Sequence, residues 1–460
     1  MAQHGFPETM HEVEKEAARH LWFHGSEENW EELTEQEGMR VFARGEGSTL
    51  WDVRGRAYLD GLSGLFVVNA GHGRREIGEV MAEQAGRVAY TAASTCSNDQ
   101  AVRLAVKLAD ITPGDLSRVF LVSGGSEAVE TAIKIARQAQ AMRGFPRRYK
   151  IIARRGSYHG MTHGAMSLTA SRVEKYHGPF MYGVSHVPSP NRYRNDFGLT
   201  GEDGDLMCAC YVEQEIENQG PETVAAVIGE PVSTSNGNHV PSPRYWQMLR
   251  DICDRHGVFL IMDEVINGFG RTGKMFAGEH FGVVPDLMTI AKGLSSGYAP
   301  IAGVMAREEV FEGFTGEGKP IEHLLTFGGH AVASAAALRN IQIIEDENLV
   351  ERSAQSGAYL MEGLQTLESH PTVGDVRGIG LMCCVDLVKD RTTRKAWGAT
   401  HAFTKDLAAR IRDRGLLTRV WGEIHLGPPL VITRDEIDSI VGIIDESLTE
   451  TEDRFASEIA

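Results

Sequence analysis

This chain of 460 residues lacks the features that mark membrane, secreted and nucleic-acid-binding proteins. It has no apolar run of about 18 residues, the length that a membrane-spanning helix needs, and its N-terminus has no signal-peptide pattern. Basic residues are few: 46 Lys and Arg stand against 63 Asp and Glu, for a net charge of −17. We therefore expect neither a membrane segment nor a nucleic-acid partner.

Cysteines are also few, and they form neither a C-x-x-C pair nor the spacing of a disulfide framework. In a chain this long we interpret all six as reduced thiols, which predicts a cytoplasmic protein. The apolar content of 42% and the charged content of 24% are typical of globular proteins and exclude wholesale disorder.

The N-terminal 40 residues are acidic and carry the aromatic residues Trp22, Phe23 and Trp30. We interpret this segment as a helical arm whose aromatic side chains dock on another surface, with a solvated helix as the alternative. Residues 41–62 contain glycine turns that predict short strands.

From about residue 70 to 325, short apolar runs alternate with helix-like stretches. Apolar strands that alternate with helices indicate an α/β fold with a mainly parallel sheet covered on both faces. The expected strands are 119–122, 149–153, 223–229, 258–262, 287–291 and 301–305. After about residue 330 the pattern changes to an α+β unit with a small antiparallel sheet. There we expect a long helix over 331–370, strands within 373–388 and 416–420, and helices over 401–414 and 434–455.

A turn suited to binding an anion follows the first expected strand, where residues 123–128 read Ser-Gly-Gly-Ser-Glu-Ala. Two glycines allow a sharp turn, Ser126 can cap the helix that follows, and Glu130 can pair with Lys134 one turn apart. Free N–H groups and the macrodipole at a helix start suit a phosphate. An ordinary capped turn is the alternative.

Asp263 and Lys292 each follow another expected strand. Parallel α/β sheets bind ligands at the carboxyl ends of their strands, so we expect both residues to approach the anion-binding turn. A lone aspartate is more often a cap and a lone lysine a surface residue, but a lysine in an apolar setting can form an imine. Pyridoxal 5′-phosphate needs a lysine for its aldehyde, a carboxylate for its ring nitrogen and donors for its phosphate, and the sequence offers all three.

Two further motifs favour other chemistries only weakly. Residues 268–273 match G-x-G-x-x-G, but Met275 stands where a P-loop carries its hydroxyl, so a nucleotide-dependent oxidoreductase is an alternative we do not favour. We expect instead a flexible glycine loop beside the pocket. Tyr158 could stack on a flat heterocycle, with simple packing as the alternative. His159 and His163 lack a nearby acid or thiol, so we do not expect a metal site.

Several motifs occur together in one order along nearly the whole chain. They are Gly125-Ser126-Glu127-Ala128, Tyr158-His159-Gly160, Gly229-Glu230-Pro231, Asp263-Glu264-Val265, the glycine run 268–273, Lys292-Gly293 and Thr326-Phe327-Gly328-Gly329. As a set they resemble the class III (ω-) aminotransferases, which are fold-type I pyridoxal-phosphate enzymes. The segments HLWFH, VNAGHGR and PETVAAVIGEP are similar to the pyruvate-dependent ω-amine and taurine–pyruvate enzymes.

The resemblance implies a large cofactor-binding domain over 66–328 with a mainly parallel seven-stranded sheet. The N-terminal arm and part of a smaller α+β domain would occupy 1–65, and the rest of that domain 329–460. It also implies pyridoxal 5′-phosphate as cofactor, a primary amine or ω-amino acid as donor, and an α-keto acid, expected to be pyruvate, as acceptor. The implied assembly is a homodimer, with a tetramer left open.

The resemblance further implies roles for single residues. Lys292 would bind the cofactor aldehyde and move a proton, Asp263 would keep the ring nitrogen protonated, and Tyr158 would stack on the ring. The implied cofactor-binding residues are Ser123, Gly125, Ser126, Tyr158, His159, Glu230, Asp263, Val265, Lys292 and Thr326, the last reaching the cofactor of the neighbouring subunit. The implied substrate-binding residues are Phe66, Glu230 and Arg419.

Arg419 is similar to the mobile arginine that binds an oxo-acid carboxylate and swings aside for uncharged amines. A guanidinium on a long stem suits both tasks. Phe66 stands where many relatives carry tryptophan, Ser-Gly-Gly-Ser replaces an Asn-Ser-Gly-Ser run, and His330 replaces an asparagine. Donor identity and stereochemistry therefore stay open. The alternatives are taurine–pyruvate transamination, an aminomutase or decarboxylase of the same superfamily, and a catalytically silent homologue.

Overall fold

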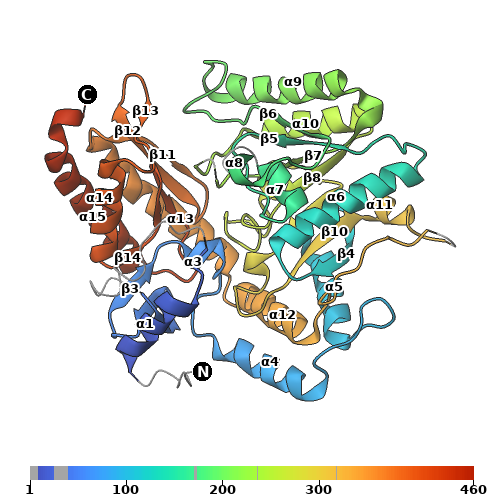
Figure 1. Ribbon diagram of the computed structural model, residues 1–460, viewed down its shortest axis with the longest axis horizontal. Coiled ribbons are helices and arrows are strands. Elements are labelled where there is room, and N and C mark those ends of the chain that lie inside the picture. Colours follow the sequence, from blue (N-terminus) through green and yellow to red (C-terminus); the bar gives the residue numbers. More distant parts are fainter. Residues whose placement is uncertain (1–8, 25–39, 170–173, 236, 317–318, 460) are drawn as a thin grey trace.

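The computed structural model describes residues 9–24, 40–169, 174–235, 237–316 and 319–459. The middle of the chain forms a larger α/β part at the right of Figure 1, and segments from both ends of the chain lie side by side in a smaller part at the left. The helices at the joint and at both ends are α1 (Met10–His20), α3 (Ser63–Phe66), α4 (Arg75–Arg87), α12 (Ala331–Asp346), α13 (Leu349–Thr366), α14 (Ala402–Asp413) and α15 (Arg434–Arg454).

A seven-stranded sheet forms the centre of the larger part, in the order β4–β10–β9–β8–β7–β5–β6. The strands from β9 to β6 are parallel, and β10 runs antiparallel to both β4 and β9, which confirms the predicted α/β fold with a mainly parallel sheet. The strands are β4 (Leu116–Val122), β5 (Lys150–Arg154), β6 (Val184–Val187), β7 (Val224–Gly229), β8 (Phe259–Asp263), β9 (Leu287–Ile290) and β10 (Ala302–Arg307). Strand β6 was not predicted, because this short edge strand is only partly buried and carries two polar residues.

Helices cover both faces of this sheet because successive side chains of each strand point to opposite faces. Ile151 packs in the cluster that contains α6, whereas Ile152 packs in the cluster formed with α9 and α10. The helices of the larger part are α5 (Asp99–Ile111), α6 (Gly125–Met142), α7 (His163–Thr169), α8 (Glu174–His177), α9 (Gly201–Gln219), α10 (Pro243–His256) and α11 (Glu308–Glu312).

The smaller part contains two sheets: the short strands predicted within 41–62 form one together with β14, and the small antiparallel sheet predicted after residue 330 is the other. A four-stranded sheet has the strand order β1–β2–β3–β14. The parallel pairing of β14 with β3 joins the N-terminal and C-terminal segments of the chain. A second sheet has the strand order β11–β12–β16–β15, and β13 pairs with β12. The strands are β1 (Phe42–Glu46), β2 (Thr49–Asp52), β3 (Ala57–Asp60), β11 (Val373–Gly378), β12 (Cys383–Asp390), β13 (Lys395–Ala396), β14 (Leu416–Leu417), β15 (Arg419–Val420) and β16 (Glu423–Leu426).

Two other expectations for the C-terminal part are wrong in detail. Residues 416–420, expected as one strand, divide at Thr418, since Leu416–Leu417 pair with β3 and Arg419–Val420 pair with β16. The long helix expected over 331–370 divides into α12 and α13 because Asn348 adopts a left-handed conformation, φ 51°. Asparagine tolerates that conformation better than most residues.

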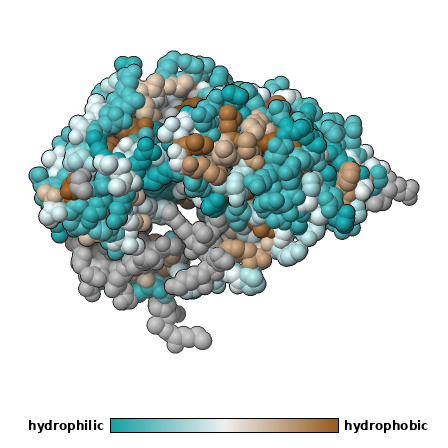
Figure 2. All heavy atoms as spheres, turned by 90° about the horizontal axis from the view of Figure 1, so that it is seen from above, coloured by the Kyte–Doolittle hydropathy of each residue, from teal (hydrophilic) through white to brown (hydrophobic). Residues whose placement is uncertain are grey.

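Of the N-terminal arm, the structure describes residues 9–24 and residue 40. Arg54 binds the carboxylate of Glu14, which attaches α1 to the first sheet. Trp22 is 95% exposed and Phe23 is partly buried, while Trp30 lies outside the described residues. The face seen in Figure 2 is mostly hydrophilic with scattered hydrophobic patches. No helix among the described residues is long and apolar enough to cross a membrane.

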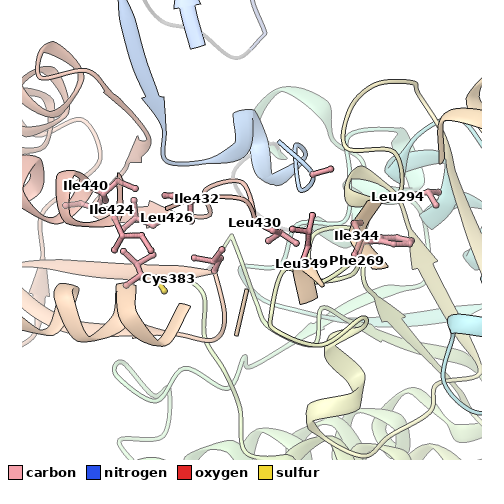
Figure 3. Close-up of a cluster of buried hydrophobic side chains, with 14 of the residues drawn as sticks. Phe269, Leu294, Ile344, Leu349, Cys383, Ile424, Leu426, Leu430, Ile432 and Ile440 are labelled. Carbon is pink, nitrogen blue, oxygen red and sulfur yellow. The ribbon is translucent and has the colours of Figure 1, made fainter. Parts of the chain in front are cut away.

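One hydrophobic cluster joins the two parts of the molecule. Figure 3 shows it running from Ile440 and Ile424 through Leu430 to Phe269 and Leu294. The glycine run 268–273 lies at this joint, and our expectation of a flexible loop is wrong because the run is tightly packed. Phe269 is fully buried, and a side-chain carbon on Gly273 would lie 2.9 Å from that of Ala354.

Arg271 fixes the glycine run in place. Its side chain is fully buried, and its Nη1 donates to the carbonyl groups of Leu381 and Pro428. Its Nη2 donates to Ser63 Oγ at 3.0 Å and to Asn69 Oδ1 at 2.7 Å. Burial lowers the pKa of this guanidinium to about 9, so it still carries its charge near neutral pH. The arginine therefore connects segments from the start, middle and end of the chain.

We expect Arg271→Met to destabilise the protein by about 3 kcal/mol or more, because four buried acceptors would lose their donor. Urea and thermal unfolding of the purified protein measure the change, with Lys274→Met as a control on an exposed residue of the same loop. Unfolding midpoints equal to those of the wild type would show that Arg271 does not hold the joint.

Candidate active site

The carboxyl ends of five strands place the predicted residues along one edge of the large sheet. Asp263 ends β8, Lys292 follows β9, and Glu230 follows β7. Tyr158 comes after β5, and Ser123 comes directly after β4, which runs in the same direction as β9. Since these ends belong to strands of one direction, they meet at the same side of the sheet.

The start of α6 touches the ends of two of these strands. A side-chain carbon on Gly125 would lie 3.0 Å from Val265 and 3.7 Å from Ala291, the neighbour of Lys292. Only a glycine leaves this space open. The anion-binding turn, the aspartate strand and the lysine strand therefore converge, as the order of the motifs predicts.

Asp263 is a buried carboxylate with three partners. His159 Nδ1 lies 2.7 Å from its Oδ2, while Thr289 Oγ1 and the Val265 N–H donate to its Oδ1 at 2.8 and 3.1 Å. An ionised carboxylate offers roughly four acceptor positions. The contacts among the described residues therefore leave capacity for one more donor.

Ser126 does not cap α6, contrary to our expectation. Gly124 is the N-cap residue, and Ser126 Oγ instead accepts the N–H of Met161 at 3.1 Å. Gly160 makes this possible: its φ is +123°, and a side-chain carbon there would lie 2.3 Å from Ser126 Oγ. The serine thus fastens the segment after Tyr158 to the start of α6.

The carboxylates of Glu127 and Glu130, at and just after the turn, also have partners that the sequence did not indicate. The Ser123 N–H donates to the Glu127 carboxylate at 2.8 Å. The expected pairing of Glu130 with Lys134 is wrong, because the Glu130 carboxylate accepts the N–H groups of Gly164 and Ala165 at the start of α7. The free N–H groups at the start of α6 belong to its first turn, where helical geometry provides no acceptor.

Tyr158 and Glu230 are joined through the backbone. The Tyr158 N–H donates to Glu230 Oε1 at 3.2 Å, and the tyrosine residue is 41% exposed. Glu230 Oε2 lies 3.2 Å from the guanidinium of Arg154, and both side chains are buried. Arg154 also lies over the face of Trp246, so a buried cation holds the carboxylate that positions the tyrosine segment.

Lys292 has the most altered electrostatic setting among the predicted residues. Burial lowers the pKa of its amine to about 8, the charge of Asp263 opposes this shift, and those of Arg419 and Arg271 add to it. Its backbone has φ +43°, which is unusual for a residue other than glycine. An amine with this pKa is neutral far more often near neutral pH than a surface lysine, which suits a nucleophile or base.

Arg419 lies close enough to Lys292 to influence its pKa. Its guanidinium is 4.6 Å from the ring centre of Trp421 and 5.9 Å from that of Phe66. Phe66 itself is almost fully buried, in a left-handed conformation, with Gly427 packed against its ring. The buried ring of Phe66 therefore lies beside the guanidinium of Arg419.

Thr326 is exposed and lies in a turn that packs on β4. The backbone at Gly328 approaches the Leu121 carbonyl so closely that a side-chain carbon would lie 2.7 Å from it. His330 is the N-cap residue of α12, without a side-chain cap bond, and its ring lies 6.3 Å from that of Phe327. A role of Thr326 toward a neighbouring subunit stays a prediction.

Sequence reasoning missed Thr289 and Arg154. Thr289 was counted as part of an apolar strand, although a single hydroxyl three residues before Lys292 was a usable signal. Arg154 stands at a strand end, as Asp263 does, and is 2% exposed. Because Asp263 was predicted from its place at the end of a strand, Arg154 at the end of β5 could have been predicted in the same way.

Pyridoxal 5′-phosphate fits the residues that are present. The amine of Lys292 suits an aldehyde, the Asp263 carboxylate has capacity for a ring N–H, and the first turn of α6 offers N–H groups for a phosphate. The missing side chain at Gly125 leaves the space between Val265 and the turn open.

Known proteins are similar to this chain in sequence and architecture. The family described as Aminotransferase class-III matches residues 33–448. Taurine–pyruvate aminotransferase from Bilophila wadsworthia is 38% identical, with 93% of this chain and 96% of that protein covered. Putrescine–pyruvate aminotransferase from Pseudomonas aeruginosa is 35% identical, with 92% and 93% covered.

Two solved structures are similar over nearly their whole length. An (S)-enantioselective ω-transaminase from Thermomicrobium roseum has a TM-score of 0.92 and 40% identity, with 97% of this chain and 99% of that chain covered. An amine transaminase from an uncultivated Pseudomonas species, solved in a PLP-bound form, has a TM-score of 0.89 and 36% identity, with 94% and 99% covered.

We expect the cofactor-free protein to capture pyridoxal 5′-phosphate covalently at a rate that rises with pH and levels off above about pH 8, because only the neutral amine attacks an aldehyde. Stopped-flow absorbance measures the rate, and Lys292→Ala is the control that identifies the lysine. A rate that still climbs toward the ordinary lysine pKa of 10.5 would contradict the lowered pKa.

Proposed function

The chain belongs to the class III aminotransferases, which depend on pyridoxal 5′-phosphate, and from this premise we propose that it moves an amino group from a primary amine or ω-amino acid to an α-keto acid, with pyruvate as the acceptor, in two ping-pong half-reactions. The observation that carries the proposal is the amine of Lys292, whose pKa is lowered to about 8 at the same sheet edge as the Asp263 carboxylate.

The cofactor, when bound, supplies an electron sink next to the carbon that carries the amino group. In our proposal Lys292 Nζ holds the cofactor at rest and then takes and returns the proton of the substrate carbon. A pKa near neutrality suits both directions of that transfer. Asp263 would accept a hydrogen bond from the ring N–H and so favour the protonated ring, while His159 and Thr289 fix the carboxylate.

The cofactor would be held by its ring and by its phosphate. We propose that the Tyr158 ring stacks on one face of the cofactor and Val265 packs on the other, with Glu230 lining the pocket beside the tyrosine. The Ser123 hydroxyl and the N–H groups of Gly125 and Ser126 would bind the phosphate.

We further propose a homodimer in which Thr326 reaches the phosphate of the neighbouring subunit's cofactor. Thr326 is exposed, and the apolar side chains of Leu324 and Phe327 beside it are 62% and 59% exposed. Exposed apolar side chains that lie together, rather than singly, favour a protein–protein contact. Tyr90, also exposed, lies against Phe327 and extends the same surface.

Arg419 would bind the carboxylate of the keto acid, with Phe66 behind it. Its guanidinium lies within electrostatic reach of Lys292, which is where the acceptor must react. The taurine–pyruvate and putrescine–pyruvate relatives are both named for pyruvate, and this supports that acceptor over others. Their donors differ, so the donor of this chain needs a direct test.

The test mixes the purified holoenzyme with single donors and follows cofactor absorbance. The panel contains an uncharged arylalkylamine, taurine, β-alanine and putrescine. We expect at least one donor to convert the cofactor and pyruvate to reverse that conversion. A protein that binds the cofactor and responds to no amine, or that releases carbon dioxide or isomerises a donor, would contradict the proposal.

We expect Arg419→Ala to weaken the pyruvate half-reaction by about a hundredfold, since a charge-assisted bidentate contact is lost, while an uncharged amine changes little. The separate half-reactions, each measured by stopped-flow absorbance, provide the comparison. Equal losses for both substrates would remove Arg419 from its proposed role.

A further inference from the structure

The segment that leads to Thr326 lies along α6, the helix whose first turn we propose for the phosphate of its own subunit. Gln138, on this helix, binds two backbone groups of the segment: its Nε2 donates to the Pro320 carbonyl at 2.7 Å, and its Oε1 accepts the N–H of Glu322 at 3.1 Å. Gln138 follows Thr131 by seven residues, or about two turns, so both side chains lie on the same face of α6. The chain therefore follows one face of α6 just before it reaches Thr326.

His323 binds this face of α6 with both ring nitrogens. Its Nε2 lies 2.9 Å from Thr131 Oγ1, and its Nδ1 lies 3.3 Å from Lys134 Nζ. The buried hydroxyl of Thr131 donates its hydrogen to the Glu127 carbonyl at 2.7 Å, so it accepts from the ring, and Nε2 carries the ring hydrogen. The Lys134 ammonium has only hydrogens to offer and donates to the lone pair of Nδ1. Both contacts require a neutral ring with its hydrogen on Nε2.

The surroundings of His323 also favour the neutral ring. Burial lowers the pKa of this imidazole, the positive charge of Lys134 lowers it further, and the charges of Glu127 and Glu130 oppose the shift. One face of the ring stacks on Phe120 of β4, with the ring centres 5.2 Å apart and the planes 13° from parallel. His323 therefore attaches its segment to the helix by two hydrogen bonds and to the sheet by one ring face.

The chain after Thr326 has a separate attachment. The Gly329 carbonyl accepts from Asn98 Nδ2 at 2.9 Å, and Asn98 is itself fixed as the N-cap residue of α5, where it accepts the N–H of Ala101. Thr326 lies three residues after His323 and three before Gly329, and its own side chain is exposed. Its position therefore depends on these two attachments and not on burial of the threonine itself.

We propose that His323 is a positioning residue, which fixes the segment before Thr326 to α6 so that the Thr326 hydroxyl meets the phosphate of the neighbouring subunit's cofactor. This inference rests on the proposed role of Thr326 in the homodimer. One helix would then serve two cofactors: its first turn binds the phosphate of its own subunit, and its Thr131 holds the segment that reaches the other.

The test compares pyridoxal 5′-phosphate with pyridoxal, which has the same ring and aldehyde but no phosphate. The full-length, cofactor-free protein is titrated with each compound, and absorbance gives the two dissociation constants. For His323→Ala we expect the dissociation constant of pyridoxal 5′-phosphate to rise about tenfold, because a charge-assisted contact to the phosphate is misplaced, while that of pyridoxal stays within about twofold. Glu322→Ala is the matched control, since it changes an exposed side chain and keeps the N–H that Gln138 binds.

A double-mutant cycle shows whether His323 acts through Thr326. We expect Thr326→Ala to raise the dissociation constant of pyridoxal 5′-phosphate about tenfold, and the addition of His323→Ala to change it by less than about twofold more. Thermal unfolding and light scattering check that each variant is folded and dimeric. If His323→Ala fails that check, Thr131→Val takes its place, because it removes the acceptor of the ring N–H and keeps the shape of the side chain.

The outcomes separate the two claims. Equal losses for pyridoxal and its phosphate, or an effect of His323→Ala that adds in full to that of Thr326→Ala, would overturn the role of His323. If Thr326→Ala selectively weakens the phosphorylated compound and His323→Ala does not, only the inference about His323 fails. If Thr326→Ala changes the binding of neither compound, the proposed role of Thr326 fails and the inference fails with it.

Discussion

The rest of the site depends on keeping the Lys292 amine in a setting poor in water, beside one carboxylate and within reach of two guanidinium groups. Burial makes the charged form of an amine costly, and the positive charges of Arg419 and Arg271 add to that cost. Asp263 limits the shift, so that the pKa lies near 8 rather than far below neutrality. The balance produces an amine that can both lose and regain a proton under ordinary conditions.

The fold provides this setting through two features. The large sheet brings Asp263, Lys292 and the start of α6 to one edge, and the glycines at 125 and 160 allow the backbones to approach. The joint between the two parts of the molecule then brings β15 and β16 toward that edge. Arg271 holds the joint through four neutral acceptors.

Much of this could be predicted from the sequence, because buried parallel strands are continuous apolar runs and the residues that follow them must share an edge. The positions of Asp263 and Lys292 followed from that rule alone. The partners of Ser126 and Glu130 did not, since Met161 and Gly164 lie 35 and 34 residues away and nothing local indicates the contact. The glycine run 268–273 was expected to be flexible, because glycine content alone does not show whether neighbouring chains pack against it.

The central claim is that Lys292, rather than another amine, holds the cofactor. The most direct measurement reduces the purified, cofactor-loaded protein with borohydride and locates the resulting pyridoxyl group by peptide mass spectrometry. We expect one modified site, at Lys292, with the yellow colour lost on reduction. Modification at any other lysine, or none after the protein has been supplied with pyridoxal 5′-phosphate, would contradict it.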